Sequence, residues 1–305
     1  MRSLLAGCCL ILVAVAPALA AAAASSLPGT YAQELLEQVS KANPDLLGAT
    51  ISAVAPKTAH MVVVASTEQR PAGAPADPDD TAALQGNTAS KVDANGTRVD
   101  VHLPLHDVAG DTVGSLHLTY AYKTGANIAA FSSSAAHVRD RLQRRISHVG
   151  NLFDPYPYEA DAPSADILAQ QLVDELIESH PEIEILAIHA TPPESDYNVI
   201  AGSNIGRLGK KADNDDMRCI FTGKPNLEVN STGKRFESEM QLHDRAGRLV
   251  GAVGVVVAYK KGDDKQALFK HATVIRAELE RKIPDSDSLF RTAAASSTQD
   301  SRSKS

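Results

Sequence analysis

Residues 105–114 read LHDVAGDTVG, and residues 242–251 read LHDRAGRLVG. Both copies fit the pattern L-H-D-x-x-G-x-x-V-G, in which a strand must stop, turn and begin again. The aspartate can accept backbone N–H bonds within a turn, and the first glycine can take a positive φ without steric cost. The second glycine suits a bulge or a close approach between backbones. We therefore predict a structural role in a strand–turn–strand unit for Asp107, Gly110, Gly114, Asp244, Gly247 and Gly251.

The match between the two copies extends far beyond this motif. When the chain is shifted by 137 positions, residues 31–146 align with residues 168–283 without any gap. The identical pairs in this alignment include Pro44/Pro181, Gly86/Gly223, Arg98/Arg235, Tyr122/Tyr259 and Ile146/Ile283. A constant offset over such a span indicates duplication of one domain. We predict a first domain over residues 25–146 and a second over residues 166–283.

Two segments fall outside the repeat. Residues 147–165 are rich in proline, which favours extended chain over helix, so we predict a linker between the domains. Residues 284–305 are rich in Ser, Thr and Ala and have little to bury, so we predict a disordered tail.

The first 24 residues have the features of a secretion signal. A basic residue, Arg2, precedes an apolar run and a small-x-small sequence, and cleavage after Ala20 or Ala24 fits equally well. A lipobox ending at Cys8 is the alternative, but the apolar run before that cysteine is shorter than the roughly 7 to 15 residues a signal core needs. We expect a periplasmic or secreted protein with a cleaved signal peptide, rather than a lipoprotein.

The composition excludes several classes of protein. The 305 residues carry a formal net charge of -7, which argues against non-specific binding to nucleic acid. No later segment has the roughly 20 unbroken apolar residues of a membrane span. With Cys8 and Cys9 in the signal, Cys219 is the only thiol left, so we expect no internal disulfide.

Within each unit the pattern predicts a helix, two strands, an irregular stretch, three antiparallel strands and a closing helix. The irregular stretches cover residues 67–90 and 204–227. Stretches of that length without periodicity inside a compact domain are commonly functional. The predicted fold class is α+β: two tandem domains, each a five-stranded antiparallel sheet with N- and C-terminal helices.

This order of elements, together with the motif entering the last strand, resembles the PAS-like sensor fold and specifically the extracytoplasmic Cache family. The resemblance implies a small-molecule pocket over the sheet, walled by the irregular stretch. The chain departs from the family in two respects. It has no Trp, which the pattern of amino-acid-binding Cache domains contains, and no output domain follows. We therefore expect any signal to leave by binding another protein.

For a pocket in the second domain, cationic and aromatic side chains near the irregular stretch are the candidates. Several cations would favour an anionic ligand such as a carboxylate, which Arg can grip through two hydrogen bonds. The predicted ligand-binding residues are Tyr197, Arg207, Lys210, Arg218 and Arg235. The first domain is rich in Ala and Pro over the same stretch, which marks it as the structural copy.

Other chemistry has weaker signals. His102, His106 and His117 fall on neighbouring predicted strands, so a haem or metal site is an alternative, but no ligand motif with metal spacing occurs. The usual nucleophile, phosphate and dinucleotide motifs are also missing. We predict no enzymatic activity, no cofactor and no metal.

Two functions remain from this reading besides the less favoured haem or metal-binding protein. The first is an exported small-molecule sensor that relays ligand status to an envelope partner. The second is a structural or interaction protein whose pockets are filled by its own side chains.

Overall fold

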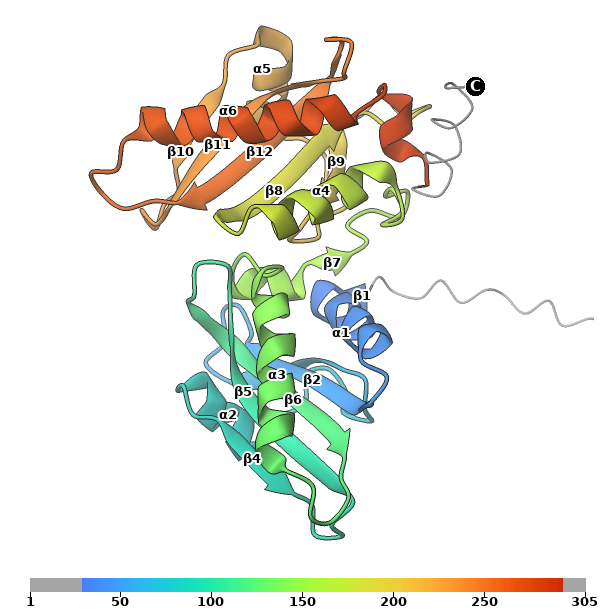
Figure 1. The fold of residues 1–305 in the computed structure, drawn as a ribbon, viewed down its shortest axis with the longest axis vertical. Helices are drawn as coiled ribbons and strands as arrows, with labels where there is room; N and C mark the ends of the chain where they lie inside the picture. Colours follow the sequence, from blue (N-terminus) through green and yellow to red (C-terminus); the bar gives the residue numbers. More distant parts are fainter. Residues whose placement is uncertain (1–28, 293–305) are drawn as a thin grey trace, which may run out of the picture.

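The protein forms two α+β domains of the same design, as predicted from the repeat. The structure is a computed structural model that describes residues 29–292, so the expected signal segment 1–24 lies outside the described residues. Figure 1 shows the two domains one above the other, joined near η1 and β7. Across residues 29–292, no helix is long and apolar enough to span a bilayer.

The first domain is built on a sheet with the strand order β3-β2-β6-β5-β4, in which all neighbours are antiparallel. Its elements are β1 (Gly29–Thr30), α1 (Tyr31–Ala42), β2 (Leu46–Val54), β3 (Met61–Ser66), α2 (Pro78–Leu84), β4 (Ala89–Val92), β5 (Arg98–His106), β6 (Thr112–Ala121) and α3 (Ile128–Gln143). The sheet and its flanking helices α1 and α3 match the predicted unit. The short helix α2 lies inside the stretch that was expected to be irregular.

The second domain repeats this order as β9-β8-β12-β11-β10. Its elements are α4 (Leu168–Ser179), β8 (Ile183–Ala190), β9 (Val199–Ser203), α5 (Asn214–Thr222), β10 (Asn226–Val229), β11 (Arg235–His243), β12 (Leu249–Ala258) and α6 (Lys265–Lys282). Between the domains lie η1 (Val149–Phe153) and β7 (Pro155–Tyr156), and η2 (Asp287–Phe290) follows α6. The fold class is therefore confirmed, and the architecture is that of two tandem PAS/Cache-like domains.

The two faces of each sheet differ in polarity because side chains alternate along a strand. On β5, Val99, Val101 and Leu103 point into the apolar core with α1 and α3, whereas His102 points to the opposite face. The α2 and α5 helices cover that opposite face in their respective domains. Buried polar side chains gather there, so this face is where a binding site is to be sought.

The tail prediction is wrong at its beginning. Residues 284–292 are folded: η2 packs against the core of the second domain, with Leu289 fully buried in it. The turn Asp285–Ser288 is closed by a hydrogen bond from Ser288 N to Asp285 Oδ1, 2.8 Å long. Leu289 and Phe290 supply the apolar surface that this segment buries against the core. The high Ser and Ala content of the segment as a whole hid this pair from the composition argument. Residues 293–305 lie outside the described part.

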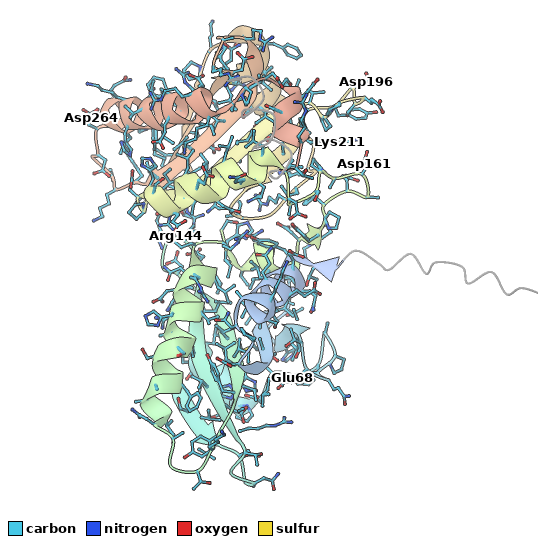
Figure 2. All side chains as sticks on the ribbon, turned by 45° about the vertical axis from the view of Figure 1, so that its right-hand side comes forward. Glu68, Arg144, Asp161, Asp196, Lys211 and Asp264 are labelled. Atoms are coloured by element: carbon cyan, nitrogen blue, oxygen red, sulfur yellow. The ribbon has the colours of Figure 1, made fainter. Side chains whose placement is uncertain are left out.

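Specific polar contacts hold the domains together. The Tyr31 hydroxyl donates to Arg145 O at 3.1 Å in its own domain and to Asn204 O at 3.3 Å in the second. Arg144 donates to the carbonyls of Ile177 and Pro181 near the end of α4, at 2.8 and 2.6 Å. Figure 2 labels Arg144 at this junction. The carbonyls at a helix C-terminus favour a cation, so Arg144 complements α4.

We expect Asn204→Ala to lower the free energy of unfolding by about 2 to 3 kcal/mol, because it leaves several buried backbone groups without a hydrogen-bond partner. The Asn204 Oδ1 accepts from Leu186 N at 2.9 Å, and its Nδ2 donates to Arg144 O at 2.8 Å and Glu184 O at 2.9 Å. Denaturant unfolding of the full chain measures the loss. Asn87→Ala is the control, since Asn87 is exposed and should shift stability by less than about 0.5 kcal/mol. Equal stability of the two variants would contradict the assignment.

Candidate functional site

A cluster of titratable side chains is buried in the first domain between α2 and the sheet. Asp80 on α2 is completely buried, and its carboxylate lies 3.0 Å from His102 Nδ1 on β5. The imidazole of His117 on β6 stacks on that of His102, with ring centroids 4.1 Å apart. These residues meet because His102 and His117 are direct partners in the β5–β6 ladder.

Every titratable group in this first cluster has partners. Besides His102, Asp80 accepts from Ser52 Oγ at 3.1 Å and from Arg70 Nη2 at 3.4 Å. His117 Nε2 lies 3.2 Å from Asp100 Oδ1. The network is therefore closed on itself.

Ionisation in the first cluster follows from these contacts. Burial acts to raise the pKa of Asp80, but the hydrogen bond with His102 and the charges of His102, His117 and Arg70 together outweigh burial, and the pKa is lowered. Burial acts to lower the pKa of His117, yet the hydrogen bond that His117 donates to Asp100 and the negative charge of Asp80 leave that pKa raised. These contacts therefore favour the ionised form of Asp80 and the protonated form of His117.

The second domain holds a different cluster on the matching face, under α5. It consists of His189 on β8, Asp216 on α5 and Glu239 on β11, with one ligating atom of each within 4.8 Å of the others. His189 and Glu239 are only 7% and 3% exposed. The Nδ1 of His189 lies 3.5 Å from Asp216 Oδ2, beyond a good hydrogen bond.

Two atoms of this second cluster are buried without a partner. Among the residues that the structure describes, His189 Nδ1 and Glu239 Oε1 have no hydrogen-bond partner. A buried polar atom left unpaired costs about 1 to 3 kcal/mol, so such atoms call for an explanation. The two copies of the fold therefore differ: the first cluster is satisfied and the second is not.

The electrostatics of the second cluster reflect crowded carboxylates. Burial, followed by contact with the Asp216 carboxyl, raises the pKa of Glu239 to about 9. Burial also lowers the pKa of His189, and the negative charge of Asp216 only partly opposes this. At neutral pH, Glu239 is protonated and His189 is neutral, so Asp216 is the ionised member.

The repeat relates the two clusters position by position. At the offset of 137 residues, Ser52 corresponds to His189 and His102 to Glu239. Sequence reasoning did not select any of the three second-domain residues. The signal that was available is a polar residue interrupting an apolar strand: His189 within ILAIHA and Glu239 within RFESEMQLH.

The predicted ligand-binding residues do not converge on one site. Tyr197 is 56% exposed, with the Lys211 ammonium 4.1 Å from its ring centroid, and Figure 2 shows Lys211 on the outer side of the domain. Arg218 is exposed and pairs with Asp215 at 2.7 Å. Lys210 is the one that lies near the second cluster, where its charge lowers the pKa of His189 after burial and the acidic neighbours.

Arg207 and Arg235 lie at the junction of the domains instead. Arg207 Nε is 3.1 Å from Asp154 Oδ2. Arg235 Nε is 2.8 Å from Glu184 Oε2, and its Nη2 is 3.4 Å from Asp107 Oδ2 in the first domain. Their charges are thus already paired with carboxylates. The first residues of the stretch 204–227 contact the first domain. Only the part of the stretch from α5 onward covers the sheet of the second domain.

The motif residues act in turns. Asp107 Oδ1 accepts from Ala109 N and Asp111 N at 2.9 and 3.0 Å. Asp244 Oδ1 repeats this with Ala246 N and Arg248 N, both at 2.9 Å. Gly110 and Gly247 have φ of 83° and 79°, which glycine adopts freely.

His106 does not join His102 and His117. His106 lies four residues beyond His102, about 13 Å further along β5, past the point where the pairing skips Val113 of β6. Its Nδ1 faces the Thr112 hydroxyl at 3.3 Å instead. The alternative of a haem or metal site with all three histidines therefore has only His102 and His117 side by side, because His106 lies too far along the strand.

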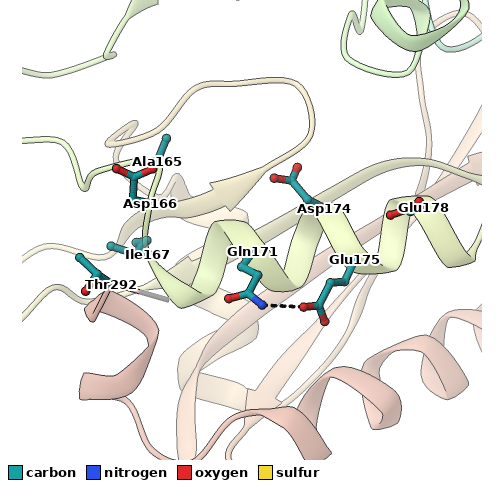
Figure 3. A pocket seen from close by; sticks show the side chains of 8 residues that line it. All are labelled: Ala165, Asp166, Ile167, Gln171, Asp174, Glu175, Glu178 and Thr292. Atoms are coloured by element: carbon teal, nitrogen blue, oxygen red, sulfur yellow. Dashed lines mark hydrogen bonds between the residues drawn. The ribbon is translucent and has the colours of Figure 1, made fainter. Parts of the chain in front are cut away.

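Two open grooves lie outside these clusters, along the helices α4 and α6 of the second domain. A groove of about 690 Å³ runs along α4 and is lined mainly by acidic and polar side chains. Figure 3 shows it, with the hydrogen bond from Gln171 to Glu175. It lies on the side of the second sheet opposite to α5. A second groove of about 740 Å³ lies along α6 beside Val274, which is 58% exposed.

Comparison with known proteins gives little further guidance. No family model matches the chain, and no curated protein matches it. Among solved structures, PelD from Pseudomonas aeruginosa PAO1 aligns with 85% of this chain and 79% of its own, at 15% identity and a TM-score of 0.28. An extracellular ligand binding receptor from Desulfohalobium retbaense DSM5692 aligns with 77% of this chain and 34% of its own, at 12% identity and a TM-score of 0.22. Likenesses at this level carry no argument about function, so the class of the protein rests on its strand order and domain plan.

Proposed function

We propose that the chain is an exported, non-enzymatic sensor-type protein that binds a small ligand beneath α5 in its second domain and relays the bound state to a partner protein. The observation that carries this is the contrast between the two copies. In the first-domain cluster, Asp80, His102 and His117 are all hydrogen-bonded to neighbouring side chains, whereas in the second-domain cluster His189 Nδ1 and Glu239 Oε1 are buried without a hydrogen-bond partner in the part of the chain that the structure describes. A ligand contacting these two atoms would supply the bonding partners that the protein itself does not provide.

The position of the cluster supports the proposal. Buried between a helix and the sheet, a ligand would contact α5 and the two strands β8 and β11 at once. Binding would then shift the position of α5 or β11 slightly. The anionic ligand expected from the five cationic and aromatic candidates has no support from their positions, because Arg207 and Arg235 are paired at the domain junction.

A thermal-shift screen of the full chain tests the function. Ligand binding to the native state raises stability by mass action, by about 2.7 kcal/mol at a hundredfold excess over Kd. We expect at least one small molecule or ion to raise the melting temperature of the native chain and not that of His189→Ala. If no compound and no ion stabilises the chain, the sensor function is wrong.

That negative result would favour the second candidate, an interaction protein of the envelope. The observation on its side is the groove along α6 with Val274 exposed. The aromatic residue Phe131 on the corresponding helix α3 packs against Tyr120 at a ring distance of 5.4 Å and is unsuitable for such a substitution. Val274 is the better position for a charge.

A further inference from the structure

We propose that His189, Asp216 and Glu239 bind a divalent transition-metal ion directly. This rests on the proposed function, because it names the ligand class of the same site. The three side chains come from β8, α5 and β11, so the ion would tie the middle helix to two strands of the sheet.

The geometry is close to that of a three-ligand metal site. Nitrogen and oxygen ligands of Zn²⁺ lie roughly 2.0 to 2.2 Å from the ion, which places neighbouring ligand atoms about 3 to 3.5 Å apart. His189 Nδ1 and Asp216 Oδ2 are already 3.5 Å apart. All three ligating atoms lie within 4.8 Å of one another, so side-chain adjustments suffice to close the set.

The unpaired atoms are themselves ligand atoms. His189 Nδ1 and Glu239 Oε1 are both buried and have no hydrogen-bond partner within residues 29–292. A neutral imidazole nitrogen and a carboxylate oxygen are what a transition-metal ion binds. Coordination would satisfy both atoms at once.

Asp216 is held in place by its own helix. Its Oδ2 accepts from Asp213 N at 2.7 Å as part of the capping box at the start of α5. Fixing a ligand by such an outer contact is a common feature of metal sites. The charges also balance once metal binding releases the proton of Glu239, since two carboxylates and a neutral imidazole would then neutralise a divalent cation in a buried place.

The first-domain cluster is the weaker candidate for a metal. Asp77, Asp80, His102 and His117 also come within metal-binding distance of one another. However, the Arg70 guanidinium lies 3.5 Å from Asp77 and 3.4 Å from Asp80 and occupies the place of a cation. The nearest cation to the second cluster is Lys210, for which no ion pair with these carboxylates is found among the described residues.

The ligand set selects the kind of ion. One imidazole nitrogen with two carboxylates suits Zn²⁺, Mn²⁺ or Fe²⁺, whereas Ca²⁺ prefers six to eight oxygen ligands and Mg²⁺ keeps most of its waters. Three protein ligands also leave a coordination position open, as catalytic and exchangeable sites do.

Isothermal titration of the chelator-treated full chain with ZnCl₂ tests the inference. We expect one tight site that MgCl₂ and CaCl₂ do not occupy. Glu239→Gln and Asp216→Asn should each weaken Zn²⁺ binding by at least about tenfold, the lower end of what losing even an outer contact costs. Both replacements keep size and shape, so far-UV circular dichroism should remain native.

Asp77→Asn is the matched control, because it alters the other cluster and should leave Zn²⁺ affinity unchanged. Unaltered affinity in both Glu239→Gln and Asp216→Asn overturns the inference, and so does a loss confined to Asp77→Asn. A parallel thermal-shift screen of organic compounds in the presence of EDTA separates the two proposals. Stabilisation there without any Zn²⁺ site would retain the sensor function and reject the metal.

Discussion

Replacing Gly251 by alanine is expected to lower the free energy of unfolding of the second domain by at least about 4 kcal/mol. Gly251 is the last residue of the repeated motif and pairs with Ala190 in the β12–β8 ladder. A Cβ at this position would overlap the carbonyl oxygen of His189, which is backbone and cannot turn away. Its φ of 156° adds strain for any residue with a side chain.

Gly247→Ala provides the matched control within the same motif. A Cβ there meets nothing within 4 Å, so only the positive φ of 79° opposes the change. That costs about 1 to 2 kcal/mol. Denaturant unfolding of both variants measures the difference. Similar losses for the two glycines would show that the close approach to His189 does not decide stability.

Glu239→Gln is expected to make the chelator-treated protein more stable than the native chain at pH 8, with little difference near pH 4.5. The pKa of Glu239 is raised from 4.5 to about 9 by burial first and by Asp216 next. Between these values the folded state binds one proton more than the unfolded state. The free energy of unfolding therefore falls by up to about 1.4 kcal/mol per pH unit as the pH rises through this window.

Glutamine removes this dependence because it stays neutral in both states. The melting temperature of Glu239→Gln, followed from pH 5 to pH 9 in chelator, should fall less steeply than that of the native chain. Glu228→Gln, an exposed change on β10, should leave the native slope unaltered. Parallel slopes for the native chain and Glu239→Gln would contradict the assigned environment of Glu239.

The sequence was sufficient to predict the architecture because the fold depends on features that repeat. Period-two alternation on β5 and β11, helix stripes ending before Pro44 and Pro181, and the glycine turns all recur at one offset. The short helices α2 and α5 were missed, since seven and nine residues give too little periodicity to register. Their caps, Asp77 and Asp213, were the available signal.

The candidate site was less accessible to sequence reasoning. Cations in the irregular stretch looked like ligand residues, but their partners lie in distant parts of the chain: Asp154 for Arg207, and Asp107 with Glu184 for Arg235. Such pairings depend on how two domains dock, and no local pattern encodes them. The second-domain cluster likewise joins three elements that only the folded sheet brings together.

Strand β11 reaches from the domain boundary to the proposed site. Arg235, at its first position, contacts Asp107 of the first motif, and Glu239 lies four residues further, about 13 Å along the strand. Strand β11 is therefore held at one end by a contact with the first domain, and it carries Glu239, a residue of the proposed site in the second domain. A ligand that draws Glu239 toward α5 pulls against that contact. If the proposed site binds its ligand in this way, occupancy and the angle between the domains would be linked reciprocally, and a partner that contacts both domains would change the affinity for the ligand.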